Sequence, residues 1–255
     1  MTLAEEYKNQ AKWRNWDYFV NKLPVQSQDT IIDIGCSVGT MTGKLALRSK
    51  QVIGIDSNPE LLAEANKGAT ASNISSRLMD ARFLNDSDFP RADGIWSSFL
   101  PAYIPDFSPV LSNWLRLLKP DGWIALVEMS DLFGHHPLSY QTKELFKDYC
   151  DRYQRLYDVE MGSKLGDIAA DCGLSIISNE IVPDQELSFK GPASTEILAA
   201  WDSRLNRMTR FQQFVGDSRF TDIKKEFLEC LSDINHTSDT TVNFVIARKD
   251  FPDYD

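Results

Sequence analysis

Short apolar runs alternate with amphipathic stretches along most of the chain. The runs are four to eight residues long and separated by polar turns, which is typical of buried strands, while apolar positions at helical spacing predict helices between them. Strands alternating with helices in this way predict a parallel sheet covered on both faces. The predicted strands are 30–34, 51–56, 74–79, 93–98, 123–129, 175–182 and 241–248, with helices at 41–47, 59–69, 107–118 and 162–172.

Three further segments look like a helical cover over this core. Apolar positions at helical spacing fill Leu3–Leu23 and end at Pro24, and 132–157 reads as mainly helical. Pro183–Thr240 holds almost sixty residues between the last two strands, far more than a hairpin needs. We therefore expect an N-terminal helical lid (1–24) and one core domain (25–255), in which segments 132–157 and 183–240 cover the substrate.

Composition narrows the class of partner. The 255 residues are 42% hydrophobic and 25% charged, as in an ordinary globular protein. Lys and Arg number 27 against 37 Asp and Glu, which gives a formal net charge of −10. An acidic chain lacks the electrostatic footprint of a nucleic-acid or anionic-membrane binder, although a local basic patch is compatible with it. A small-molecule substrate is favoured.

The cysteines and the N-terminus point to a cytoplasmic protein. Cys36, Cys150, Cys172 and Cys230 are scattered without zinc-site spacing, so we expect reduced thiols and no metal. The first residues lack a basic start followed by an apolar run, and no stretch approaches the ~20 apolar residues that span a bilayer. The expected state is a monomer or homodimer.

Candidate chemistry begins where the first strand turns into the first helix. Asp33-Ile34-Gly35-Cys36-Ser37-Val38-Gly39 places glycines where a backbone must approach a ligand closely. Asp56 ends the second strand, where a carboxylate can accept both hydroxyls of a ribose. Asp80 ends the third strand and is followed by Ala81.

These motifs, in this order, resemble the class I S-adenosylmethionine (SAM) dependent methyltransferases. The resemblance spans about 30–131 and is implied by four signatures: Ile32-Asp33-Ile34-Gly35-Cys36-Ser37-Val38-Gly39, Val52-Ile53-Gly54-Ile55-Asp56, Leu78-Met79-Asp80-Ala81 and Leu117-Leu118-Lys119-Pro120-Asp121-Gly122-Trp123. The family implies an α/β, Rossmann-like, seven-stranded and mostly parallel sheet with an antiparallel last strand. It also implies SAM as cofactor and S-adenosylhomocysteine as product.

The resemblance also implies roles for individual residues. Gly35 to Gly39, with Cys36 and Ser37, would line the methionine end of SAM, and Asp33 would either order this loop or contact the SAM amino group. Asp56, beside Ser57, would bind the ribose diol, and Asp80 with Ala81 would bind adenine. Trp96 and Ser97 would flank the sulfonium, with Phe99 facing the substrate.

One departure from the family pattern opens a second interpretation. Ser37 stands where the family often has glycine, and we expect it to keep a negative φ. Gly35-Cys36-Ser37-Val38-Gly39 also matches the nucleophile elbow of α/β hydrolases, with His236 late enough to complete a triad. Only 36 residues, mostly helical, precede Ser37, so the strands that carry such an elbow are missing and the hydrolase is disfavoured.

Catalytic and substrate-binding residues are less constrained. His135 and His136 follow the fifth strand, and one of them is a candidate general base, the alternative being surface residues. Aromatic residues could close over the cationic sulfur, the alternative being ordinary packing. The arginines of the insertion, Arg204, Arg207 and Arg210, are expected in solvent, and one pointing inward would favour an acidic substrate. The substrate-binding candidates are Tyr7, Trp13, Phe99, Tyr103, Trp201 and Phe211.

The stretch Tyr157-Asp158-Val159-Glu160-Met161-Gly162 is similar to the small-molecule branch of the family, which includes quinone and natural-product methyltransferases. Trp96-Ser97-Ser98-Phe99 stands where an Asn-Pro-Pro-Tyr type motif would indicate amino-methylation of bases or glutamine. The predicted function is methyl transfer from SAM to oxygen, nitrogen or carbon of a small organic molecule. The alternatives are an aminopropyl transferase and a non-catalytic SAM-binding protein of the same fold.

Overall fold

The computed structural model describes residues 2–250 and contains a seven-stranded sheet in the order β3-β2-β1-β4-β5-β9-β7. The first five strands run parallel, and β9 is antiparallel to both β5 and β7. The predicted Rossmann-like sheet with an antiparallel last strand is confirmed. Its strands are β1 (Thr30–Ile34), β2 (Gln51–Asp56), β3 (Ile74–Leu78), β4 (Ala92–Ser98), β5 (Leu118–Ser130), β7 (Ser175–Ile181) and β9 (Thr241–Arg248).

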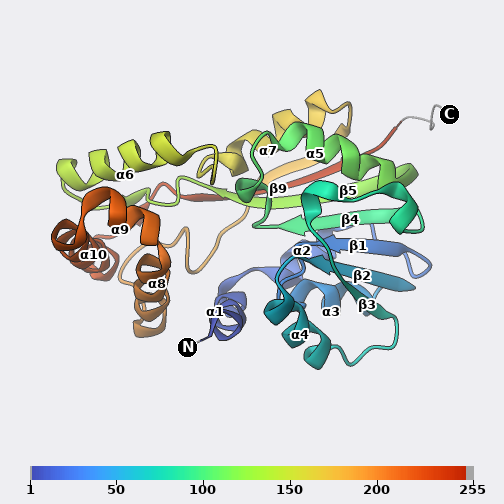
Figure 1. Cartoon of the computed structure of the whole chain (residues 1–255), viewed down its shortest axis with the longest axis horizontal. Coiled ribbons are helices and arrows are strands. Elements are labelled where there is room, and N and C mark those ends of the chain that lie inside the picture. Colours follow the sequence, from blue (N-terminus) through green and yellow to red (C-terminus); the bar gives the residue numbers. More distant parts are fainter. Residues whose placement is uncertain (1, 251–255) are drawn as a thin grey trace.

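Helices cover both faces of the sheet (Figure 1). On one face lie α5 (Phe107–Trp114) and α7 (Met161–Asp171), and on the other α2 (Trp16–Lys22), α3 (Thr40–Ala46) and α4 (Pro59–Gly68). Central strands such as β1 are buried almost along their whole length, because both of their faces are covered. This two-sided burial explains why the strands read as continuous apolar runs.

The remaining helices gather at one end of the sheet. α6 (Tyr140–Tyr153), α8 (Thr195–Arg207), α9 (Thr209–Val215) and α10 (Asp217–Ser232) form a group at the left of Figure 1, and α1 (Leu3–Gln10) lies between α8 and α4. This is the end where the parallel strands terminate. The predicted helical cover is therefore present as helices, although its division into a lid and a core domain stays a prediction.

Short elements connect these parts. A two-stranded sheet joins β6 (His135–His136) to β8 (Thr237–Ser238), and it was not predicted because each strand has only two residues. The turn predicted at 119–122 lies inside β5, where Asp121 and Gly122 pair with Lys249. The 3-10 helices are η1 (Ala11–Trp13), η2 (Ala81–Phe83), η3 (Asp86–Asp88), η4 (Pro101–Tyr103) and η5 (Leu115–Leu117).

None of the helices within residues 2–250 combines the length and the apolar character that crossing a bilayer requires.

Candidate active site

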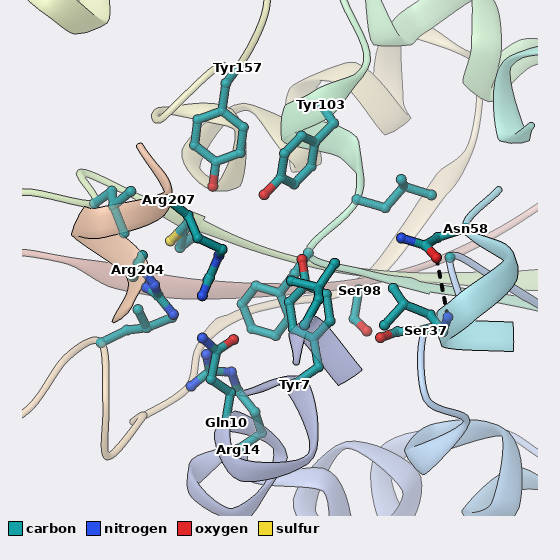
Figure 2. Close-up of a pocket in the computed structure, with 18 of the residues that line it drawn as sticks. Tyr7, Gln10, Arg14, Ser37, Asn58, Ser98, Tyr103, Tyr157, Arg204 and Arg207 are labelled. Carbon is teal, nitrogen blue, oxygen red and sulfur yellow. Dashed lines mark hydrogen bonds between the residues drawn. The ribbon is translucent and has the colours of Figure 1, made fainter. Parts of the chain in front are cut away.

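A cavity of about 530 Å³ lies at the carboxyl ends of β1, β2, β4 and β5 (Figure 2). In open α/β sheets this edge is where ligands bind, and the volume is that of a small-molecule site. The first strand contributes the glycine turn, the second contributes Asp56, and the helical cover closes the opposite side.

The glycine turn after β1 is shaped by left-handed backbone. Gly35 and Gly39 both have φ +80°, a conformation that costs other residues about 1–2 kcal/mol. A Cβ built at Gly35 would lie 2.9 Å from Leu100 Cδ2. The Gly35 and Cys36 amides both donate to the Ile55 carbonyl, at 2.8 and 2.9 Å, which ties the turn to β2. Of the predicted turn residues, Gly35, Cys36, Ser37 and Val38 line the cavity, and Gly39 does not.

Ser37 corrects one expectation. We expected a negative φ there, but its φ is +51°, so the serine occupies the left-handed region that a glycine would occupy without strain. Its amide donates to Asp56 Oδ2 at 2.8 Å, and this bond helps to hold the conformation. Ser37 Oγ is buried without a hydrogen-bond partner among the described residues.

Asp56 faces the cavity at the end of β2. Its two carboxylate oxygens accept from backbone amides, Oδ2 from Ser37 and Oδ1 from Asn58, each at 2.8 Å. Each carboxylate oxygen has lone pairs left for a further donor. The carboxylate is thus fixed in orientation and still open toward the cavity, whereas the neighbouring Ser57 does not line it.

Asp33 reaches the cavity from inside the core. It is 2% exposed, and its Oδ2 accepts from Thr42 Oγ1 at 2.5 Å. Burial raises its pKa to about 7, although the Thr42 hydrogen bond acts in the opposite direction. Asp33 therefore holds the start of α3 through Thr42 and also lines the cavity, while its predicted roles in the glycine loop and at the SAM amino group stay predictions.

The segment after β4 divides into a core part and a cavity part. Trp96 is fully buried against Phe19 and Phe244, and Ser97 donates to the Ile34 carbonyl, so neither lines the cavity. Phe99 does, with a φ of +53° and an amide that donates to the Val127 carbonyl at 2.8 Å. Strained backbone of this kind concentrates at functional sites.

The predicted adenine contacts lie outside the cavity lining. Asp80 pairs with the Arg82 side chain and caps η2, and the Ala81 carbonyl accepts from Trp114 Nε1 at 2.7 Å. Both residues follow β3, next to the Asp56 strand in the sheet. Their role in binding adenine stays a prediction.

On the cover side, three phenols and an amide face the cavity. Tyr7 and Gln10 come from α1, Tyr103 from η4, and Tyr157 from the segment before α7. The Tyr103 and Tyr157 rings pack edge to face with centroids 4.6 Å apart. Burial raises the pKa of the Tyr157 hydroxyl well above its ordinary value, so this phenol stays protonated.

Glu128 does not line the cavity, but it holds the segment that carries Tyr103. It is fully buried in β5, and its Oε2 accepts from the Ala102 amide at 3.1 Å while Oε1 accepts from the Met129 amide at 3.0 Å. Burial raises its pKa to about 7. The carboxyl group thereby fastens η4, which carries Tyr103, to the sheet.

Three other predicted substrate contacts are core residues. Trp13 is 9% exposed, while Trp201 and Phe211 are fully buried. Trp201 Nε1 donates to the Glu186 carbonyl, and Phe211 packs in an aromatic cluster with Phe146. None of the three lines the cavity, because Trp201 and Phe211 lie on the apolar faces of insertion helices and Trp13 packs in the same hydrophobic cluster from η1.

A buried ion network supports the cover. Arg14 Nη1 contacts Asp184 at 2.9 Å, Arg14 Nη2 contacts Glu186 at 2.6 Å, and Arg204 Nη2 contacts the other Glu186 oxygen at 2.6 Å. Burial alone would raise the Glu186 pKa, but Arg204 and Arg14 outweigh it and the pKa is lowered. The sequence contains no local signal for the part of this network that involves Arg14, because Arg14 lies 170 residues from Asp184 and 172 residues from Glu186.

The histidines do not reach the cavity. His135 is fully buried, and its Nδ1 lies 3.0 Å from His236 Nε2, while His136 pairs with Asp239 at 2.7 Å. Burial lowers the His135 pKa to about 3, so this imidazole stays neutral. The structure therefore places neither catalytic candidate on the cavity.

The triad of the hydrolase interpretation is not assembled either. His236 uses Nε2 toward His135 and Nδ1 toward the Gly191 carbonyl, at 3.1 Å. Neither nitrogen is left to take a proton from Ser37, and Ser37 Oγ has no partner among the described residues. Nothing in this geometry supports a serine nucleophile.

Comparison with known proteins bears on the strand side of the site. Residues 31–122 match the family model described as "Methyltransferase domain". That match contains the glycine turn, Asp56 and the segment after β4. Residues 31–122 therefore form a methyltransferase domain, and the chain shares the fold of solved methyltransferases. The resemblance predicted from the four sequence signatures is confirmed for this methyltransferase core.

Individual relatives share the core but differ beyond it. A demethylmenaquinone methyltransferase of Lactobacillus johnsonii is 33% identical over 128 residues, which are 48% of this chain and 51% of the relative. A cyclopropane synthase from Mycobacterium tuberculosis superposes with a TM-score of 0.60 at 16% identity, covering 92% of this chain and 82% of the other. A phosphoethanolamine N-methyltransferase 2 from Haemonchus contortus, solved with phosphomonomethylethanolamine and S-adenosylhomocysteine, superposes with a TM-score of 0.57 at 19% identity, covering 93% and 52%. The chain spans about half the length of the curated relatives it matches.

Proposed function

We propose that this chain transfers a methyl group from SAM to oxygen, nitrogen or carbon of a small organic acceptor. The observation that carries the proposal is the Asp56 carboxylate, oriented by two backbone amides and open toward a cavity that begins at the glycine turn. A carboxylate held in this way at the end of the second strand suits the paired hydroxyls of a ribose. The match of residues 31–122 to the methyltransferase domain supports the same assignment.

The residues that line the cavity fit SAM. Backbone at Gly35 approaches the cavity without a side chain, and Asp33 offers a carboxyl group on the same wall. SAM supplies a methyl group activated by a sulfonium charge. The chain's part is to bind, to orient and to exclude water, since methyl transfer is an in-line displacement in which positioning supplies much of the acceleration.

The helical cover supplies the residues that would surround the methyl acceptor. Tyr7, Tyr103 and Tyr157 place aromatic faces and hydroxyls around the space that Phe99 borders. With His135 and His136 away from the cavity, no histidine in the described residues is placed to take a proton from the acceptor. An acceptor that ionises readily, or a nitrogen with a free lone pair, needs no such base.

Calorimetric titration with S-adenosylhomocysteine tests the proposal. We expect wild-type protein to bind it in the micromolar range, and Asp56→Ala to weaken binding at least ten-fold, about 1.4 kcal/mol. Asp222→Ala, an exposed carboxylate on α10, is the matched control and should leave the affinity unchanged. Thermal melts of each variant show that it is folded. Failure of folded wild-type protein to bind would refute the proposal.

A further inference from the structure

Hydrogen-bond donors concentrate at the end of the cavity opposite the glycine turn. Figure 2 shows Ser37 and Asn58 on one side of Tyr7 and the two arginines of α8 on the other, with the Tyr103 and Tyr157 hydroxyls above them. We call this set the donor cluster. Its members, which all line the cavity, are Tyr7, Gln10, Tyr103, Tyr157, Arg204 and Arg207.

The hydroxyls of the donor cluster are not used within the protein. Tyr7, Tyr103 and Tyr157 line the cavity, and their hydroxyls donate to no protein acceptor within residues 2–250. Burial raises the pKa of Tyr7 and Tyr157, which keeps both hydroxyls protonated and able to donate. Tyr7 and Tyr157 are half-buried, and half-buried donors without an acceptor are places where a ligand oxygen is stabilised; Tyr103 is more open, at 55% exposure.

At this end of the cavity, arginine side chains also outnumber the carboxylates that pair with them. Arg14 is satisfied by Asp184 and Glu186, but Arg204 gives only one of its nitrogens to Glu186, and its remaining N–H groups have no carboxylate among the described residues. A guanidinium has five N–H donors, so most of those of Arg204 are left for another partner.

Arg207 adds a second positive group beside it. Its one carboxylate partner in the described part of the chain is Glu6 of α1, and its side chain is 36% exposed. Arg210, three residues further along the chain in α9, lines the cavity and forms no ion pair with residues 2–250. A cationic acceptor would therefore meet uncompensated like charge, whereas an anion would meet paired donors.

We infer that the acceptor carries an anionic oxyacid group, a carboxylate or a phosphate, which the donor cluster binds. The inference rests on the proposed function and gives it a substrate class. The anion lies against the arginines of α8, which leaves the methyl-accepting atom toward Phe99 and the glycine turn. The arginines then fix which end of the acceptor enters first, and bidentate guanidinium geometry suits both anions.

The test uses the S-adenosylhomocysteine complex and three small probes. Benzoate, phenyl phosphate and the neutral benzamide are titrated by calorimetry into protein saturated with S-adenosylhomocysteine. We expect at least one anion to bind ten-fold or more tightly than benzamide, and the better of the two identifies the oxyacid. Equal binding of all three probes, or no anion binding up to about 10 mM, would overturn the inference while the proposed function stands.

Variants separate ligand binding from a structural role. Arg207→Gln should remove about ten-fold of anion affinity and leave benzamide and S-adenosylhomocysteine unchanged. Glu6→Gln should strengthen anion binding, because it removes the carboxylate that competes for Arg207. If Arg207 only ties α1 to α8, both variants weaken binding alike, and the inference is wrong.

Arg219→Gln is the matched control, since Arg219 is exposed on α10 and does not line the cavity. It should not change the affinity of any probe. Loss of S-adenosylhomocysteine binding by folded wild-type protein would refute the proposed function, and this inference with it.

Discussion

The two ends of the cavity are built by different means. At the glycine turn the shape comes from backbone: two glycines and a serine in left-handed conformation, with Asp56 held by amides. At the end with the donor cluster the shape comes from side-chain charge, because Arg14, which also lines the cavity, and Arg204 share the buried Glu186. The first end uses two consecutive strand–turn units, and the second joins α8 to Arg14, which follows η1, and to the segment before α8.

Because the two ends are built differently, they tolerate different substitutions. A backbone-built end resists changes that add a Cβ or alter φ, and it is nearly indifferent to side chains that point elsewhere. A charge-built end tolerates shape changes but not the loss of one partner, because a buried charge left unpaired is costly.

The largest effect is expected from Arg14→Met. This change leaves Asp184 and Glu186 buried, at 3% and 0% side-chain exposure, with Arg204 alone to compensate them. We expect the free energy of unfolding to fall by about 3–5 kcal/mol, measured by chemical denaturation. The control is Lys147→Met, which breaks an exposed pair with Asp151 and should change nothing measurable. A loss below about 1 kcal/mol would mean that charge does not hold this end.

Gly35→Ala tests the other end. The alanine would need a φ of +80° and would place its Cβ 2.9 Å from Leu100 Cδ2. We expect a loss of about 1–2 kcal/mol in unfolding free energy, with S-adenosylhomocysteine affinity reduced about ten-fold, or 1.4 kcal/mol.

Gly43→Ala provides the contrast for Gly35→Ala. Gly43 lies inside α3, and nothing lies within 4 Å of a Cβ built there. This alanine should stabilise the protein by about 0.5–1 kcal/mol. If both alanines had the same effect on stability, the left-handed turn would not be the feature that shapes this end.

The smallest effect is expected from Ser37→Ala. Ser37 Oγ forms no hydrogen bond within the described residues, and alanine keeps the amide that donates to Asp56. We expect unfolding free energy and S-adenosylhomocysteine affinity to change by less than about 0.5 kcal/mol. Loss of catalytic turnover with unchanged binding would instead favour a nucleophilic serine.

The same contrast explains what sequence could and could not predict. β1, β2 and β9 lie at their predicted bounds because buried strands between glycine and polar turns are a local signal. Asp56 could be placed at the site because parallel strands end at one edge of a sheet. The φ of Ser37 was predicted with the wrong sign, since tertiary hydrogen bonds hold a serine in a conformation that its own preference disfavours.

The cover was harder to predict for a physical reason. An apolar helix face indicates that a surface is buried, but not what it is buried against. Trp201 and Phe211 were therefore expected at the substrate and lie in the core of the insertion. Arg204 and Arg207 were expected in solvent, but Arg204 contacts the buried Glu186 and Arg207 contacts Glu6 of α1, about 200 residues away in the chain.

The position of the tryptophans has a practical consequence. Five of the six are buried in the interior, and Trp16 alone borders the cavity, where its indole Nε1 donates to the Ala11 carbonyl at 2.8 Å. Its emission is therefore the one that an arriving ligand disturbs. Intrinsic tryptophan fluorescence can therefore report occupancy of the cavity in real time and without a label. Trp16→Phe is the control that should lose this signal.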